Sequence, residues 1–195
     1  MKNIAARTLL WVAAAFAYAG QVEAHTFGAE GAGMMAGIVH PFGGLDHLLA
    51  MLGVGIWAAQ LGGSGTWRLP LVFVGVMSFS ALLAAYGPAW PMLEAAIALS
   101  VLVLGGLILS AARLPVGLGA LMVGVLAIGH GYAHGLEIPE ADSALLYGAG
   151  FVISTASLHL IGILFGLVAR HNCWLSRVGG FAIAVTGVYL TATVV

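Results

Sequence analysis

Two short segments each bring together three residues that could bind a metal ion. They are His40–His47 and His130–Glu137, and each contains two histidines and one carboxylate. Imidazole nitrogens and carboxylate oxygens together suit divalent first-row metals such as Ni²⁺, Co²⁺, Zn²⁺, Cu²⁺ or Mn²⁺. The chain has a single cysteine, Cys173, so a site built from several thiolates is excluded.

The second segment has the spacing of a chelating helix. On a regular helix His130 and His134 lie one turn apart, about 6 Å along the axis, and Glu137 shares their face. Metal-binding helices use this i, i+4 pair of histidines. We therefore expect all three side chains to point toward one ion.

The first segment offers a similar set with less certain geometry. His40 and His47 are seven residues apart and share a face if the helix is regular, with Asp46 beside His47. Pro41 and the glycine pair 43–44 can break such a helix and free backbone carbonyls.

The composition predicts that these segments lie in a membrane. Hydrophobic residues make up 62% of the 195-residue chain, charged residues only 7%, and the mean hydropathy is +1.08. Soluble domains carry about 25% charged residues. We predict an all-α, polytopic transmembrane helix bundle in contact with lipid, and no nucleic-acid partner, because no basic stripe is present.

The N-terminus predicts a cleaved signal peptide over residues 1–24. Lys2 and Arg7 precede an apolar stretch, and Val22-Glu23-Ala24 fits a cleavage site. An uncleaved signal anchor is the alternative. Cleavage would make His25 the first residue of a mature domain, 25–195, and its amine and imidazole could chelate a metal; the alternative is an exposed histidine without that role.

Six apolar stretches long enough to span a bilayer follow the signal. Short polar loops separate them, and small-residue spacings such as Gly117 with Gly124, or Gly162 with Gly166, favour close helix packing. The predicted spans are 33–61, 69–86, 92–112, 115–136, 143–169 and 175–195.

The charges predict the orientation of these spans. A cleaved signal places the mature N-terminus in the periplasm, and the loops then expected in the cytoplasm contain Arg68, Arg113, Arg170 and Arg177, as the positive-inside rule requires. Acidic residues fall at the other end: Glu30, Glu94, Glu137, Glu140 and Asp142. We expect a multi-pass protein of the bacterial inner membrane whose two histidine segments meet in its periplasmic half.

Other readings of the polar residues stay open at this point. His159, near the middle of the fifth span, could be a ligand, a relay or a histidine hydrogen-bonded between helices. The main cluster could serve only helix packing, or a proton path. We expect no enzyme, since no HExxH motif and no nucleophile paired with a base is present.

The two segments resemble the HupE/UreJ family, membrane proteins associated with nickel-dependent hydrogenases and ureases. The family pattern HPxxGxDHxxxM matches residues 40–51 and HGxAHGxE matches residues 130–137. The resemblance implies a permease for Ni²⁺ or Co²⁺ with no tightly bound cofactor, the ion being its substrate. It implies that six residues bind or pass the ion: His40, Asp46, His47, His130, His134 and Glu137. The alternative is a metal-binding accessory that hands the ion to hydrogenase or urease maturation proteins.

Overall fold

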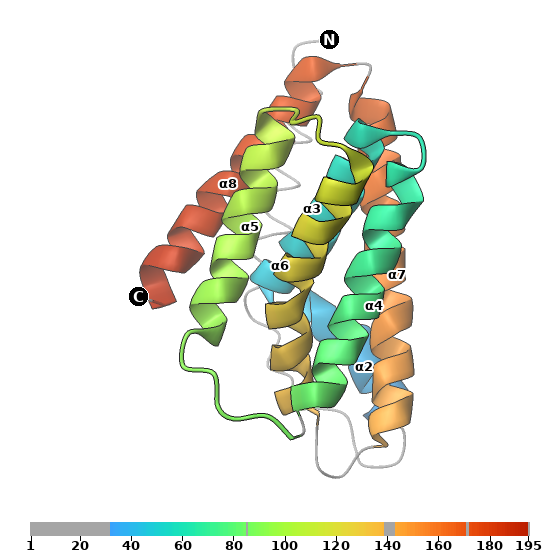
Figure 1. The fold of residues 1–195 in the computed structure, drawn as a ribbon, viewed down its shortest axis with the longest axis vertical. Helices are drawn as coiled ribbons and strands as arrows, with labels where there is room; N and C mark the ends of the chain where they lie inside the picture. The colour runs from blue at the N-terminus through green and yellow to red at the C-terminus, as the bar shows by residue number, and fades with distance from the viewer. Residues whose placement is uncertain (1–31, 85, 139–142, 171, 195) are drawn as a thin grey trace, which may run out of the picture.

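The computed structural model describes residues 32–84, 86–138, 143–170 and 172–194, and all regular structure in these ranges is α-helical (Figure 1). The predicted all-α class is confirmed. The helices are α2 Ala32–Gly43, α3 Leu45–Leu61, α4 Gly65–Ala84, α5 Leu93–Leu109, α6 Val116–Leu136, α7 Ala144–Ala169 and α8 Cys173–Val194.

The first predicted span is broken into two helices. Gly44 separates α2 from α3 in an extended conformation, with φ −110° and ψ 123°, and the two axes are bent by 84°. Pro41, inside the last turn of α2, removes a backbone donor and weakens the helix there. The predicted span 33–61 is therefore not one continuous helix, and that the bent pair forms one span stays a prediction. The expected break near Pro41 and residues 43–44 is confirmed.

The helix lengths agree with a multi-pass membrane protein. Four helices, α4, α6, α7 and most of α8, are long and apolar enough to cross a bilayer, and the bent pair α2–α3 would make a fifth. The helix α5 is apolar but has only 17 residues, about 25 Å at 1.5 Å per residue. The predicted span 92–112, which corresponds to α5, therefore stays a prediction, and so does the total of six spans.

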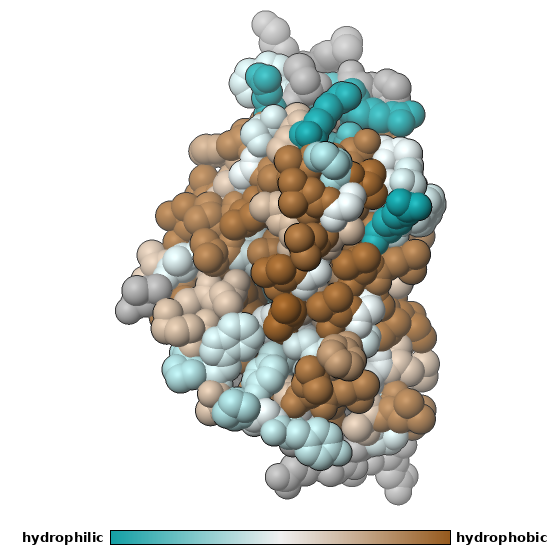
Figure 2. All heavy atoms as spheres, in the orientation of Figure 1, coloured by the Kyte–Doolittle hydropathy of each residue, from teal (hydrophilic) through white to brown (hydrophobic). Residues whose placement is uncertain are grey.

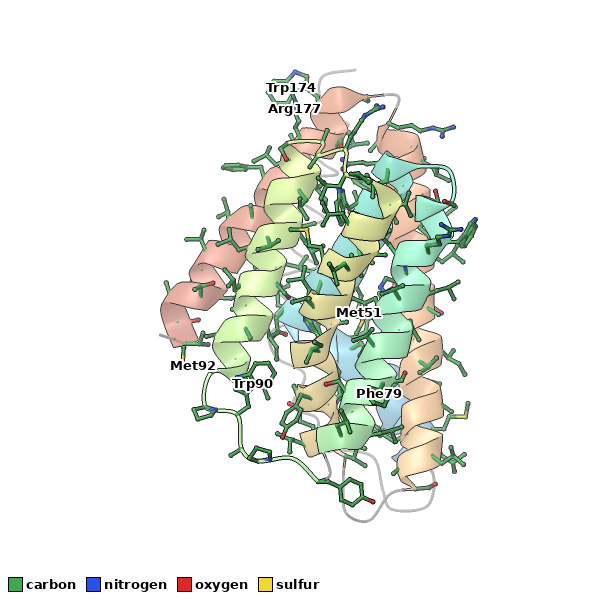
Figure 3. The ribbon with its side chains drawn as sticks, viewed as in Figure 1. Met51, Phe79, Trp90, Met92, Trp174 and Arg177 are labelled. Atoms are coloured by element: carbon green, nitrogen blue, oxygen red, sulfur yellow. The ribbon has the colours of Figure 1, made fainter. Side chains whose placement is uncertain are left out.

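The charged residues separate toward opposite ends of the bundle. The helices α3, α5 and α7 end, and α4, α6 and α8 begin, at the end drawn uppermost in Figure 1. The four arginines that the structure describes lie at these helix ends, as Arg177 does in Figure 3, and the hydrophilic colouring of Figure 2 gathers there. We call this the arginine end. Glu94 and Glu137 lie at the opposite end.

Helix α3 is central in the bundle. It packs against α2, α4, α5, α6, α7 and α8, and its residues Met51, Val54 and Trp57 are fully buried. Figure 3 shows Met51 near the middle of the molecule. The N-terminus of α3, which carries Asp46 and His47, therefore points into the bundle rather than into a loop.

Glycines let the helix backbones approach closely. A Cβ added to Gly162 of α7 would lie 2.3 Å from the carbonyl oxygen of Leu52 on α3, and one on Gly131 of α6 would lie 2.1 Å from that of Met77 on α4. The packing role expected of Gly162 and Gly166 is thus confirmed. Gly117 was expected to act in the same way, and this is wrong, because a Cβ there would meet no atom within 4 Å.

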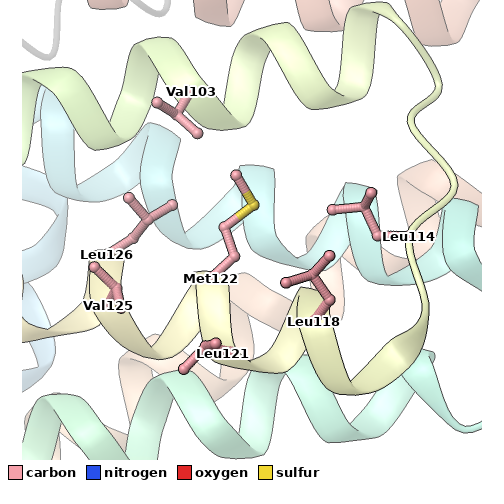
Figure 4. A pocket seen from close by; sticks show the side chains of 7 residues that line it. All are labelled: Val103, Leu114, Leu118, Leu121, Met122, Val125 and Leu126. Atoms are coloured by element: carbon pink, nitrogen blue, oxygen red, sulfur yellow. The ribbon is translucent and has the colours of Figure 1, made fainter.

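A groove of about 420 Å³ lies between α5 and α6, toward the arginine end (Figure 4). Sulfur of Met122 is the only side-chain heteroatom in its lining, and several of its residues are exposed on the bundle surface. Such a lining fits lipid acyl chains and provides no site for a metal ion. The lining residues are Val103, Leu114, Leu118, Leu121, Met122, Val125 and Leu126.

Candidate metal centre

Four histidines from three helices form one cluster. His47 on α3 lies closest to His134 on α6, with ring centroids 4.2 Å apart, and 5.0 Å from His130 one turn deeper on α6. His40 on α2 completes the group, 4.9 Å from His134 and 6.4 Å from His47. The two segments therefore meet, as expected, and we call these four side chains the histidine cluster.

The bend at Gly44 explains how one segment supplies two of these rings. On a straight helix, seven residues rise by about 10 Å along the axis. Because α2 turns away from α3 by 84°, His40 folds back over the N-terminus of α3 and reaches both His47 and His134.

Three side chains at the outer edge of the cluster are close enough to share an ion. His40, His134 and Glu137 each offer one ligand atom, and these atoms all lie within 4.8 Å of one another. Ligands on a first-row ion, with bonds of about 2.1 Å, lie at most about 4.2 Å apart, so modest side-chain rotations would suffice. Exposure falls from 47% for the Glu137 side chain to 30% for His40 and 3% for His134, so the set opens outward at its carboxylate.

Glu137 directly follows α6 and links the two histidines of this set. Its Oε2 atom lies 3.0 Å from His40 Nε2 and 3.4 Å from His134 Nδ1. Burial alone would raise the pKa of the Glu137 carboxyl, but the contacts with His134 and His40 outweigh it and hold the pKa below its usual range. A carboxylate that stays charged favours a cation at this place.

Asp46 fixes the orientation of His47. One carboxylate oxygen of Asp46 accepts from the backbone N–H of His47 and lies 2.7 Å from its Nδ1 atom. The carboxylate is also favoured in the first turn of α3, where the helix dipole is positive. With Nδ1–H donated to Asp46, Nε2 carries the lone pair, and this buried atom has no hydrogen-bond partner in the described part of the chain. Metal-binding histidines are commonly oriented in this way.

Ser100 on α5 fixes His130 in the same manner, and the sequence analysis did not identify it. Its hydroxyl has one hydrogen, which it donates to the Ile97 carbonyl at 2.7 Å, so its oxygen must accept from His130 Nε2–H, also at 2.7 Å. His130 Nδ1 is then left with a lone pair, buried and without a partner among the described residues. The only sign of this role in the sequence is that Ser100 is a polar residue inside an apolar span.

These contacts lie within the region that a protein family shares. The model of the family described as "HupE / UreJ protein" matches residues 10–190, which include both histidine segments. The chain belongs to the HupE/UreJ family. Its sequence is 42% identical to "Protein HupE" of Rhizobium leguminosarum bv. viciae over 181 residues, 91% of this chain and 93% of that protein. No solved structure matches the chain.

In this HupE/UreJ protein, two further residues from the sequence analysis, His159 and Glu94, lie outside the histidine cluster. Among the described residues, the ring of His159 on α7 contacts that of Phe73 and none of the four histidine rings; the Phe73 centroid lies 5.2 Å from His159 and 5.6 Å from His130. Glu94 is exposed in the first turn of α5. Several predictions concern residues outside those that the structure describes: the signal peptide 1–24, His25, Glu30, Glu140 and Asp142.

Proposed function

We propose that this protein is a secondary permease that carries Ni²⁺, and also Co²⁺, inward across the bacterial inner membrane. The observation that carries the proposal is the histidine cluster with Glu137, at one end of an apolar helix bundle. Three of its buried ring nitrogens have no hydrogen-bond partner among the described residues: His47 Nε2, His130 Nδ1 and His134 Nε2. Such atoms are available to a metal.

The donor set supports a borderline divalent ion. Imidazole nitrogens suit Ni²⁺, Co²⁺, Zn²⁺ and Cu²⁺, whereas Mg²⁺ and Ca²⁺ prefer oxygen ligands and Cu⁺ prefers sulfur. Membership of the HupE/UreJ family and the resemblance noted above favour nickel within this group. Zn²⁺ fits the same donors, so it is the natural competitor in any test.

The gradient of exposure supports one order of events. A hydrated ion meets Glu137 and His40 first, because these side chains are open to the outside, and it exchanges water for nitrogen ligands as it passes to His134 and His47. Inward movement needs no ATP, because a membrane potential contributes about 2.3 kcal/mol per charge per 100 mV, and thus roughly 4.6 kcal/mol for a divalent ion.

Accumulation of radioactive Ni²⁺ in cells that express the chain tests this function. His134→Ala removes a buried ring between Glu137 and His47, so it is expected to abolish uptake while the amount of protein in the membrane is unchanged. Thr186→Ala on α8, whose exposed hydroxyl bonds only to its own helix, is the matched control and should transport normally. Unlabelled Co²⁺, Zn²⁺ and Mn²⁺ added as competitors would rank the ions.

Two results would contradict the proposal. If wild-type protein is inserted and binds Ni²⁺ but gives no uptake, the metal-binding accessory is the better reading. If His134→Ala disappears from the membrane while a His134→Gln variant transports normally, the cluster serves packing instead.

A further inference from the structure

We propose that His159, together with the hydroxyl of Thr155, forms a second binding site for the divalent ion that the histidine cluster captures. We call this site the inner stop. This inference rests on the proposed function, since the stop would receive the ion on its way inward. It concerns a pair of side chains on α7 that lies outside the cluster and toward the arginine end.

His159 is a buried histidine whose polar atoms are unused. It is 2% exposed, and neither ring nitrogen has a hydrogen-bond partner in the described ranges. A histidine that only joined two helices would show a bond to the neighbouring helix, because an unpaired buried polar group is costly. The imidazole therefore presents a lone pair without a structural use.

Thr155 lies one turn from His159 on the same face of α7. It is fully buried, and its hydroxyl is likewise without a partner among the described residues. One turn further toward the cluster is Phe151, whose ring centroid lies 4.0 Å from that of His134. The stripe Phe151, Thr155 and His159 thus leads from the cluster into the bundle.

Helix α4 provides a second connection between the two places. The buried ring of Phe73 contacts both His130 and His159, whose ring centroids lie 5.6 Å and 5.2 Å away. His159 lies eight residues beyond Phe151 on α7, which is about 12 Å along the helix axis. Phe73 therefore contacts both the deepest ring of the histidine cluster and the ring of His159.

The chemistry of this pair suits a passing ion. One neutral imidazole and one hydroxyl, completed by water, bind a divalent ion more weakly than a set of histidines with the Glu137 carboxylate. Transport requires a stop that is favourable enough to enter and weak enough to leave. The ligand class is therefore the same borderline divalent cation, held less tightly than at the cluster.

Binding stoichiometry tests the inner stop without any transport. Full-length protein in lipid nanodiscs would be dialysed against saturating Ni²⁺, and the bound metal per chain compared between wild type and His159→Leu. We expect His159→Leu to bind one Ni²⁺ fewer per chain, while the tighter class of site keeps its affinity. Ser157→Ala, an exposed residue of α7 bonded to its own helix, is the control and should match wild type. Equal stoichiometry in His159→Leu would overturn the proposal.

A second variant separates function from folding. Thr155→Val keeps the side-chain volume and removes an unpartnered buried hydroxyl, so we expect a higher Tm together with Ni²⁺ flux into proteoliposomes reduced by about tenfold. A lower Tm with unchanged flux would instead assign the hydroxyl a structural role and overturn its part in the stop. If wild-type protein gives no flux at all, the proposed function fails, and the stoichiometry still decides whether the inner stop exists.

Discussion

At the scale of single residues, the cluster depends on two side chains that orient histidines. Asp46 accepts from His47 Nδ1, and Ser100 accepts from His130 Nε2, so each imidazole turns its other nitrogen toward the shared space. The two orienting groups differ in kind, a carboxylate on the same helix and a hydroxyl on a neighbouring one. Each orienting group can be substituted while the histidine that it orients is kept.

Ser100→Ala should weaken metal binding although Ser100 offers no ligand. The variant leaves His130 Nε2–H without an acceptor and allows the other tautomer, so we expect the Kd for Ni²⁺ to rise by about tenfold. Isothermal titration calorimetry of the purified protein measures this. Ser110→Ala, which removes an exposed hydroxyl of α5 bonded to its own helix, is the control. An unchanged Kd in Ser100→Ala would show that the hydrogen bond does not orient the ring.

Two substitutions of Asp46 distinguish orientation from direct ligation. Asp46→Asn keeps an oxygen that can accept from His47 Nδ1–H, whereas Asp46→Ala does not. If Asp46 only orients the ring, Asp46→Asn should bind Ni²⁺ much more tightly than Asp46→Ala. Equal losses of affinity in the two variants, measured by the same calorimetry, would favour a carboxylate bound to the metal.

Acid should release the metal, because a protonated imidazole has no lone pair to donate. Burial disfavours the protonated imidazole, so Ni²⁺ affinity should hold as the pH is lowered to about 6.5 and fall below it. The Glu137 carboxyl, whose pKa is held below its usual range, stays charged throughout. Glu137→Gln should lower the affinity at every pH and move the midpoint to lower pH, because the carboxylate also stabilises the protonated forms of His40 and His134, as competition dialysis would show. A midpoint that does not move would show that Glu137 is not coupled to the two histidines.

At the scale of elements, glycines hold α7 against the central helix. Gly162→Ala would bring a Cβ to within 2.3 Å of the Leu52 carbonyl oxygen, and helix backbones cannot yield easily, so we expect a clearly lower Tm. Gly148→Ala on the same helix meets nothing within 4 Å and should leave the Tm unchanged or slightly higher. Thermal unfolding in detergent compares the two. A similar Tm for both variants would show that the α3–α7 contact is loose.

Much of this arrangement was predictable from periodicity and charge. The apolar stretches, the helix-breaking residues near Pro41 and the common end of the two histidine segments follow from local rules. The 84° bend and the contact between His159 and Phe73 do not, since they depend on which helices pack together. Ser100 was missed for a related reason: a lone serine in an apolar helix gives no sign of its partner until the neighbouring helix is placed.

At the scale of the whole molecule, the charges and the cluster define a direction. Arginines lie at one end, the cluster and Glu137 toward the other, and His159 between them. Under the proposed orientation, an inside-negative potential pulls a divalent ion from Glu137 toward the arginine end.

Ni²⁺ flux into proteoliposomes under an imposed potential tests the central claim most directly. Purified protein would be reconstituted without ATP, a K⁺ gradient with valinomycin would set the sign of the potential, and an internal indicator would report the metal. The account predicts entry that accelerates when the interior is negative, slows when it is positive, and is absent in His134→Ala. No entry at either sign, from wild-type protein that binds Ni²⁺, would contradict a permease and leave a metal-binding accessory.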